Sequence, residues 1–218
     1  GAVSALEVFV DVCSDFGLTV SATKTKFMVS GPNISNDDLE PLAIRTMEIA
    51  HVSSFRYLGS NIHSNGRCHD DVTSRIAQAA KAFGALKKSI FHDVTLTISI
   101  KRSVYNACVL STLLYGSECW VPLQADVHAL SVFHLRCVRT ILGISRQDVW
   151  NDRITNVEVL ERWGDTLDME CRLSRRRLEW LGHVARMEDE RIPKALLFGS
   201  FPNKRPAHGP RKRWRDCV

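Results

Sequence analysis

Arginine and tryptophan side chains recur through the last third of the chain in a pattern that could bind phosphate and stack on bases. Between residues 172 and 218 the cationic and aromatic candidates are Arg172, Arg175, Arg176, Arg177, Trp180, Arg186, Arg211, Lys212, Arg213, Trp214 and Arg215. Guanidinium groups match phosphate geometry, and indole rings stack on bases. In an arbitrary protein the same pattern more often forms a solvated helix face or a tail, so both interpretations stay open at this point.

Paired acidic residues and candidate metal ligands give weaker evidence of a functional site. The adjacent pairs Asp37–Asp38 and Asp70–Asp71 lie in an expected loop and at an expected helix start, where acids are favoured by the helix dipole. His134 and Cys137 stand three residues apart, but the chain has no Cys-x-x-Cys pair, and Cys137 falls on an apolar stripe. We therefore predict no metal site, and the sequence contains neither a Gly-x-Ser-x-Gly turn nor a Gly-rich phosphate loop.

Composition indicates a folded protein of a reducing compartment. Of 218 residues 44% are hydrophobic, which is enough for a buried core. The net charge of +5 is modest, so where the charges lie matters more than their sum. Seven scattered cysteines are typical of intracellular proteins. No apolar run is long enough for a membrane span, and we expect a soluble, nuclear or cytoplasmic protein without a membrane partner.

The elements before the basic region change from mixed to helical. Apolar residues at spacings of three and four predict a helix over 2–16 with a buried face made of Val3, Leu6, Phe9, Val10, Cys13 and Phe16. Gly17 is suited to end it. Residues 27–29 are expected to form a strand, and residues 44–52 to pair with residues 55–62 as an antiparallel sheet, before a turn at 65–66.

Helical periodicity then continues over 70–88, 97–114 and 126–142. We expect Ile100 and Cys108 to face inward, and Arg75, Lys101 and Arg102 to lie away from the buried stripes. Three such helices with short connections form a small bundle. The predicted fold class is α+β and mostly α, with a small antiparallel sheet and one helix over 1–66, a helical bundle over 67–145, a basic helical region over 146–200 and a basic Pro/Gly-rich tail over 201–218.

Four blocks of the sequence resemble reverse transcriptases of non-LTR (LINE-like) retrotransposons. They are Gly17 to Met28, Phe55 to Asn61 (Phe-Arg-Tyr-Leu-Gly-Ser-Asn), Leu113 to Trp120 (Leu-Leu-Tyr-Gly-Ser-Glu-Cys-Trp) and Arg176 to Met187 (Arg-Arg-Leu-Glu-Trp-Leu-Gly-His-Val-Ala-Arg-Met). Their order matches the order in that family, and the resemblance covers nearly the whole chain. It implies the end of the palm, the primer grip, a helical thumb and a basic C-terminal region.

The resemblance also implies roles for individual residues. Phe55, Tyr57, Leu58 and Gly59 would form the primer grip that positions the primer end. Lys24 would be a remnant of the catalytic lysine near the departing pyrophosphate, where an ammonium group neutralises developing charge. Read without the family, the lysine is an ordinary charged residue at a strand edge.

The aromatic-x-Asp-Asp motif that holds the catalytic metal ions in that family is absent from this sequence. The resemblance therefore implies magnesium in the intact parent enzyme and no cofactor in this fragment, which should not polymerise alone. Its expected partners are an RNA template with a DNA primer, and the missing N-terminal fingers and palm of the parent polypeptide. Two alternatives stay open, namely a stand-alone nucleic-acid-binding module and a helical interaction protein that binds no nucleic acid.

Overall fold

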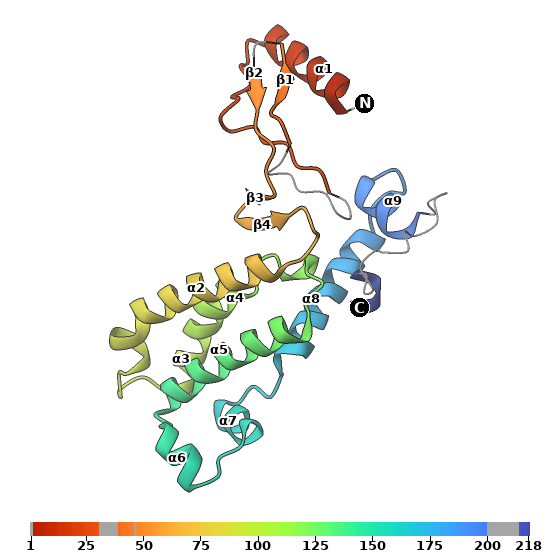
Figure 1. Cartoon of the computed structure of the whole chain (residues 1–218). Helices are drawn as coiled ribbons and strands as arrows, with labels where there is room; N and C mark the ends of the chain where they lie inside the picture. The colour runs from red at the N-terminus through yellow and green to blue at the C-terminus, as the bar shows by residue number, and fades with distance from the viewer. Residues whose placement is uncertain (1, 31–38, 46, 200–213) are drawn as a thin grey trace. The chain divides into compact units, whose positions relative to one another are not determined.

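The computed structural model describes residues 2–30, 39–45, 47–199 and 214–218, and it divides into two compact units, residues 1–67 and 68–218. The first contains one helix and two small antiparallel sheets, and the second is helical (Figure 1). The predicted α+β, mostly α fold class is confirmed. The division into four domains predicted from the sequence stays a prediction.

Helix α1 (Ala2–Asp15) opens the first unit, and Gly17 follows it with a φ of +70°, as predicted. The predicted burial of its apolar face is wrong. Phe9 is 55% exposed and Phe16 is 79% exposed, while Leu6 and Val10 are half-buried. Within this unit the helix packs beside β1 and pairs Asp11 with Arg45 just after that strand, which covers only part of the apolar stripe.

The strands of the first unit pair differently from the prediction. β1 (Leu42–Ile44) pairs with β2 (Met47–Ile49), and β3 (Ser54–Tyr57) pairs with β4 (Ser60–His63), both antiparallel. Segment 44–52 therefore does not pair with 55–62, because a tight turn inside each stretch folds it back on itself. The expected strand at 27–29 is reduced to one bridge, in which Phe27 pairs in parallel with His51.

The second unit is built from helices of different lengths. Its elements are α2 (His69–Leu86), η1 (Lys87–Phe91), α3 (Ile98–Val104), η2 (Tyr105–Leu110), α4 (Ser111–Leu113), η3 (Ser117–Cys119), α5 (Gln124–Leu142), α6 (Arg146–Asn151), α7 (Asn156–Trp163), α8 (Met169–Ala185), α9 (Ile192–Phe198) and η4 (Trp214–Cys217). η1 and η2 are π-helical turns, while η3 and η4 are 3-10 helices.

One apolar core runs through this unit, and its largest fully buried side chains include Phe91, Tyr105, Leu130, Trp163 and Leu173. These residues come from η1, η2, α5, α7 and α8, so helices distant in sequence share one core. The rings of Tyr105 and Trp163 meet edge to face at 5.6 Å. Burial of such rings supplies much of the stability of a helical core.

Local signals set several helix ends. Gly143 follows α5 with a φ of +72°, and Thr97 precedes α3 with its hydroxyl accepting from the amide of Ile100 at 3.4 Å. Asp168 caps α8 by accepting from the Cys171 amide at 2.7 Å. A side-chain acceptor at the first turn satisfies an amide that has no partner inside the helix.

The buried face of the segment 98–113 differs from the prediction. Lys101, Tyr105, Val109 and Leu113 are buried at four-residue intervals, whereas Cys108 is exposed and Ile100 is 48% exposed. The π-helical turn η2 explains much of the shift, since more than four residues per turn move the buried stripe off the ordinary α-helical period. Lys101 is only 6% exposed, whereas it was predicted to lie away from the buried stripe.

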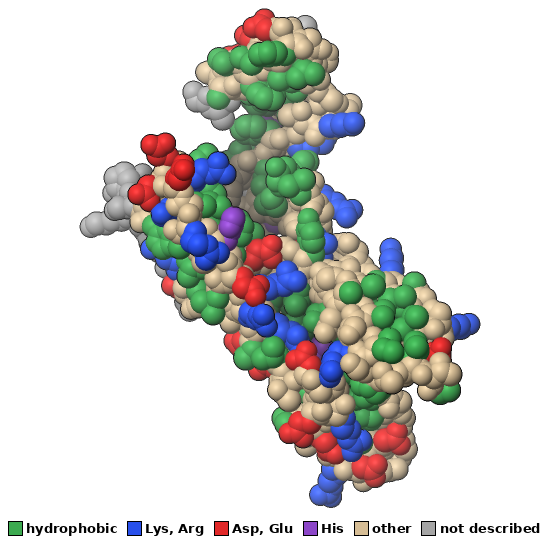
Figure 2. Space-filling view, turned by 180° about the vertical axis from the view of Figure 1, so that it is seen from behind, with side chains coloured by type: hydrophobic (Ala, Val, Ile, Leu, Met, Phe, Trp, Pro, Cys, Tyr) green, Lys and Arg blue, Asp and Glu red, His purple; other side chains and the backbone are tan. Residues whose placement is uncertain are grey.

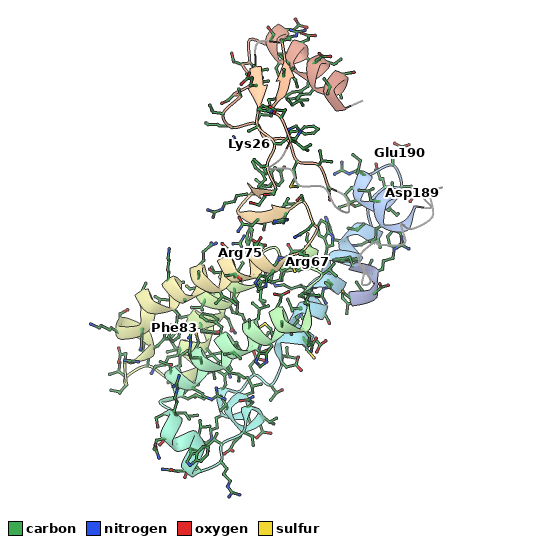
Figure 3. The ribbon with its side chains drawn as sticks, in the orientation of Figure 1. Lys26, Arg67, Arg75, Phe83, Asp189 and Glu190 are labelled. Atoms are coloured by element: carbon green, nitrogen blue, oxygen red, sulfur yellow. The ribbon has the colours of Figure 1, made fainter. Side chains whose placement is uncertain are left out.

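Two charged residues are buried on α2: Asp71, which lies in the first turn as predicted, and Arg75, which was predicted to lie away from the buried stripe. Asp71 is 2% exposed and Arg75, labelled in Figure 3, is 4% exposed, and they form an ion pair at 3.8 Å. Asp71 also accepts from the indole N–H of Trp120 at 2.9 Å, and the Arg75 guanidinium lies 4.4 Å from the ring centre of Tyr115. Buried charges require such partners, so the Tyr-Gly-Ser-Glu-Cys-Trp segment anchors α2.

Over the described residues, no helix has both the length and the apolar character needed to cross a membrane.

Candidate nucleic-acid interface

Helix α8 sorts the predicted arginines onto two sides. Met169, Leu173, Arg177 and Val184 are buried, at intervals that place them on one face. The exposed flank of the helix carries the set that we call the α8 arginine face, which comprises Arg175, Arg176, Trp180, His183 and Arg186. Trp180, three residues after Arg177 and four before Val184, lies where this flank meets the buried face.

Arg172 and Arg177 are held inside the unit. The Arg172 side chain is 10% exposed and its Nη2 lies 2.7 Å from a carboxylate oxygen of Asp165. Burial pushes the pKa of Asp165 up, but the hydrogen bond and charge of Arg172 outweigh burial and leave that pKa below its usual value. Arg177 is 5% exposed and its Nη1 donates to the carbonyl of Cys217 at 3.0 Å. In this conformation neither guanidinium can reach a phosphate.

The arginines of the α8 arginine face are accessible. The Arg175 side chain is 72% exposed and donates to Glu179 at 2.9 Å, and the Arg176 side chain is 37% exposed, with its Nη1 3.8 Å from a carboxylate oxygen of Glu118. Exposed ion pairs of this kind contribute little free energy, so a phosphate can replace the carboxylate. Arg186 is exposed, and its guanidinium lies along the helix, since a Cβ at Gly182 would be 3.3 Å from its Nη1.

The two predicted stacking residues are partly buried. Trp180 has its ring centre 5.4 Å from that of His183 on the same face. Trp214 donates its indole N–H to the carbonyl of Glu118 at 2.6 Å, and Arg215 beside it is exposed. The predicted residues Arg211, Lys212 and Arg213 lie outside the described residues.

Acidic groups accompany these cations. On the side of the molecule shown in Figure 2, Lys and Arg side chains are interspersed with Asp and Glu. Glu179 and Glu118 contact the α8 arginine face directly. Glu118 was not predicted from the sequence, although it is the acid of the Tyr-Gly-Ser-Glu block, because its contacts come from residues 58 and 96 positions further along the chain.

The predicted primer-grip residues form a hairpin in the first unit and not one continuous strand. Leu58 and Gly59, with φ angles of +47° and +90°, make the two-residue turn between β3 and β4. Positive φ at a leucine is uncommon and is imposed here by the turn. Tyr57 is 57% exposed and Leu58 is 75% exposed, while Phe55 is partly buried with its ring 6.5 Å from that of Tyr57.

Lys24 lies exposed in a turn of the same unit, where its amide donates to the carbonyl of Ser21 at 3.2 Å. Lys26, labelled in Figure 3, follows just before the Phe27 bridge. The catalytic role implied for Lys24 stays a prediction.

His134 and Cys137 belong to the core. Cys137 is 2% exposed, as the apolar stripe predicted, and burial raises its pKa to about 12. His134 is also 2% exposed, with its Nδ1 2.8 Å from the hydroxyl of Tyr105, and burial lowers its pKa to about 4. Across the part of the chain that the structure describes, no three His, Cys, Asp or Glu side chains gather closely enough to hold a metal ion.

A cavity of about 460 Å³ lies between the first turns of α5 and α8. Gln124, His128 and Ser131 line it from α5, and Asp168 and Glu170 from the start of α8. None of the predicted site residues lines this cavity.

Comparison with known proteins identifies a relative but no family. No protein-family model matches the chain, and no solved structure matches it. The chain is 26% identical over 222 residues to an uncharacterized transposon-derived protein of Caenorhabditis elegans, and the match covers 98% of this chain and 76% of the relative.

Proposed function

We propose that this chain derives from a transposable element and is the C-terminal part of a non-LTR retrotransposon reverse transcriptase, which grips an RNA template and its DNA primer. Two observations support the origin. The four sequence blocks occur in the order found in those enzymes. The relative named as transposon-derived matches almost the whole chain.

The observation that carries the binding function is the α8 arginine face. Arg175 and Arg176 are accessible along α8 and Arg186 at its C-terminal end, and the indole of Trp180 lies at the edge of the same flank, four residues after Arg176. Phosphates would replace Glu179 and Glu118 as guanidinium partners, because charge-assisted bonds from arginine to phosphate are among the stronger hydrogen bonds. The Trp180 ring would stack on an accessible base.

The hairpin tip supplies the second contact of the proposal. Tyr57, Leu58 and Gly59 would touch the primer end through an exposed ring and the turn backbone. Nucleotidyl transfer itself requires metal-bound carboxylates, which in the intact parent enzyme would hold magnesium. We expect the purified chain to incorporate no deoxynucleotide on a primed RNA template, and measurable incorporation would contradict this proposal.

Binding is tested by fluorescence anisotropy on a primed RNA–DNA duplex across about 50 to 200 mM salt, a range over which phosphate contacts weaken steeply. The variant carries Arg175→Gln, Arg176→Gln and Arg186→Gln. Each phosphate contact contributes about 0.9 to the slope of log affinity against log salt, so the variant should lose about 2.7 of that slope.

The control variant carries Arg136→Gln, Arg146→Gln and Arg162→Gln, which removes the same charge from exposed positions of the same unit. Arg162 pairs with Glu158 four residues earlier, as Arg175 pairs with a glutamate four residues later. Equal losses in the two variants would show that net charge, and not the α8 arginine face, governs binding.

The interspersed acids favour one competing function, a helical interaction protein that binds no nucleic acid. Undetectable binding of the wild-type chain at low salt would support that alternative and exclude the grip proposed here.

A further inference from the structure

Helix η4 shares two side-chain hydrogen bonds with other helices of the unit. Trp214 donates its indole N–H to the carbonyl of Glu118 at 2.6 Å. Arg177 donates from Nη1 to the carbonyl of Cys217 at 3.0 Å. Helix η4 thus contacts both η3 and α8.

Arg177 is unusual among the arginines of α8. It is 5% exposed, and its Nε is buried and has no hydrogen-bond partner among the described residues. Arg172, Arg175 and Arg176 each contact a carboxylate, whereas Arg177 contacts none in the described part of the chain. A guanidinium buried against one neutral carbonyl is costly to keep, because a charged group loses more on burial than one such hydrogen bond restores.

The position of Arg177 connects it to the α8 arginine face. Arg177 lies three residues before Trp180, and residues three apart are neighbours on a helix surface. Removal of η4 would return the guanidinium to solvent beside Trp180. A 3-10 helix of four residues belongs to the class of segment that opens locally at low cost.

From these contacts we propose that η4 is a displaceable cover that withholds Arg177 from the α8 arginine face. With η4 in place, Arg177 is satisfied by the Cys217 carbonyl and cannot touch a ligand. With η4 displaced, Arg177 adds one guanidinium to the phosphate-binding surface. This inference rests on the proposed nucleic-acid binding, and it makes that binding adjustable by the same chain.

The cover is tested first without nucleic acid. An arginine-specific dicarbonyl reagent is applied to the full chain, and modification is read peptide by peptide by mass spectrometry. In the wild type, exposed Arg175 should react and Arg177 should be protected. Trp214→Ala should make Arg177 react at a rate approaching that of Arg175, whereas Trp150→Ala, which removes an 83% exposed indole on α6, should leave Arg177 protected.

Binding is tested second, on the same primed RNA–DNA duplex. Trp214→Ala should steepen the slope of log affinity against log salt by about 0.9, which corresponds to one added phosphate contact. Adding Arg177→Gln to that variant should restore the wild-type slope. Trp214→Phe keeps the ring and removes the indole N–H, so it replaces Trp214→Ala if circular dichroism shows that the alanine variant is unfolded.

Each result decides between the two proposals. Wild-type Arg177 reacting as fast as Arg175, or staying protected in the Trp214 variants, would overturn the cover. Reactive Arg177 with an unchanged salt slope would overturn its effect on binding while leaving the proposed function intact. Absence of binding by the wild type and the variants alike would overturn the proposed function and the inference with it.

Discussion

The buried histidine of α5 should make the helical unit sensitive to mild acid. His134 is 2% exposed and its Nδ1 contacts the hydroxyl of Tyr105 at 2.8 Å, while its Nε2 is buried and finds no hydrogen-bond partner in the part of the chain that the structure describes. Burial first, and then the positive charge of Arg172, lower the pKa of His134 from 6.5 to about 4, against the smaller opposing effect of Asp165.

The sign and the magnitude follow from proton linkage. Below pH 6.5 the unfolded chain binds a proton at His134, while the folded chain does so only near pH 4. The stability that the neutral ring provides is therefore complete above pH 6.5 and is lost as the pH falls through about 4. The full loss is about 3 kcal/mol, of which about 2 kcal/mol has gone by about pH 5.

The assay is urea unfolding followed by circular dichroism, at about pH 7 and about pH 5, for the wild type and His134→Gln. Glutamine cannot titrate in this range, and other titrating groups act equally in both proteins. The free energy of unfolding of the wild type should therefore fall by about 2 kcal/mol more than that of the variant. An equal fall in the two proteins would refute the assignment of a neutral, buried imidazole.

Three further outcomes are expected. Gly84→Ala should stabilise the chain by about 0.5–1 kcal/mol in thermal unfolding, because Gly84 lies in a helix and an added Cβ would meet no atom within 4 Å, whereas Gly143→Ala should destabilise it by about 1 kcal/mol, because the φ of Gly143 is +72°. Stability changes of the same sign in the two variants would contradict this. Arg102→Ala should cost about 1–2 kcal/mol in urea unfolding, because Arg102 donates at 2.7 Å to the carbonyl of Trp163, the last residue of α7, and at 2.9 Å to that of Gly164, which follows it. An unchanged midpoint would show these bonds to be ineffective. His69 Nδ1 lies 2.6 Å from a carboxylate oxygen of Asp126, and the hydrogen bond and then the charge of Asp126 raise the pKa of His69, so this contact stabilises the fold below pH 6.5 and its stabilisation is lost as the pH rises through the raised pKa. His69→Gln should abolish this loss of stability with rising pH, and an NMR titration of the His69 ring should show a pKa above 6.5.

The sequence by itself determined the features that depend on neighbours along the chain. The periodicity of apolar residues located α1, α2 and α5, and the residue types at Gly143 and Asp168 are those that end and begin helices. These features need only short-range sterics and local hydrogen bonds. The mostly helical fold class follows from them, and so does the placement of arginines along α8.

The tertiary structure alone decided which polar side chains are buried and which strands pair. Asp71 is buried because the indole of Trp120, 49 residues later, donates a hydrogen bond to it. Arg177 is buried because the carbonyl of Cys217, 40 residues later, accepts a hydrogen bond from it. A helix pattern marks such residues as polar and places them outside, since it contains no information on distant partners. Strand pairing within 44–63 likewise depended on turns at Arg45 and Leu58, whose positive φ angles no side-chain preference indicates.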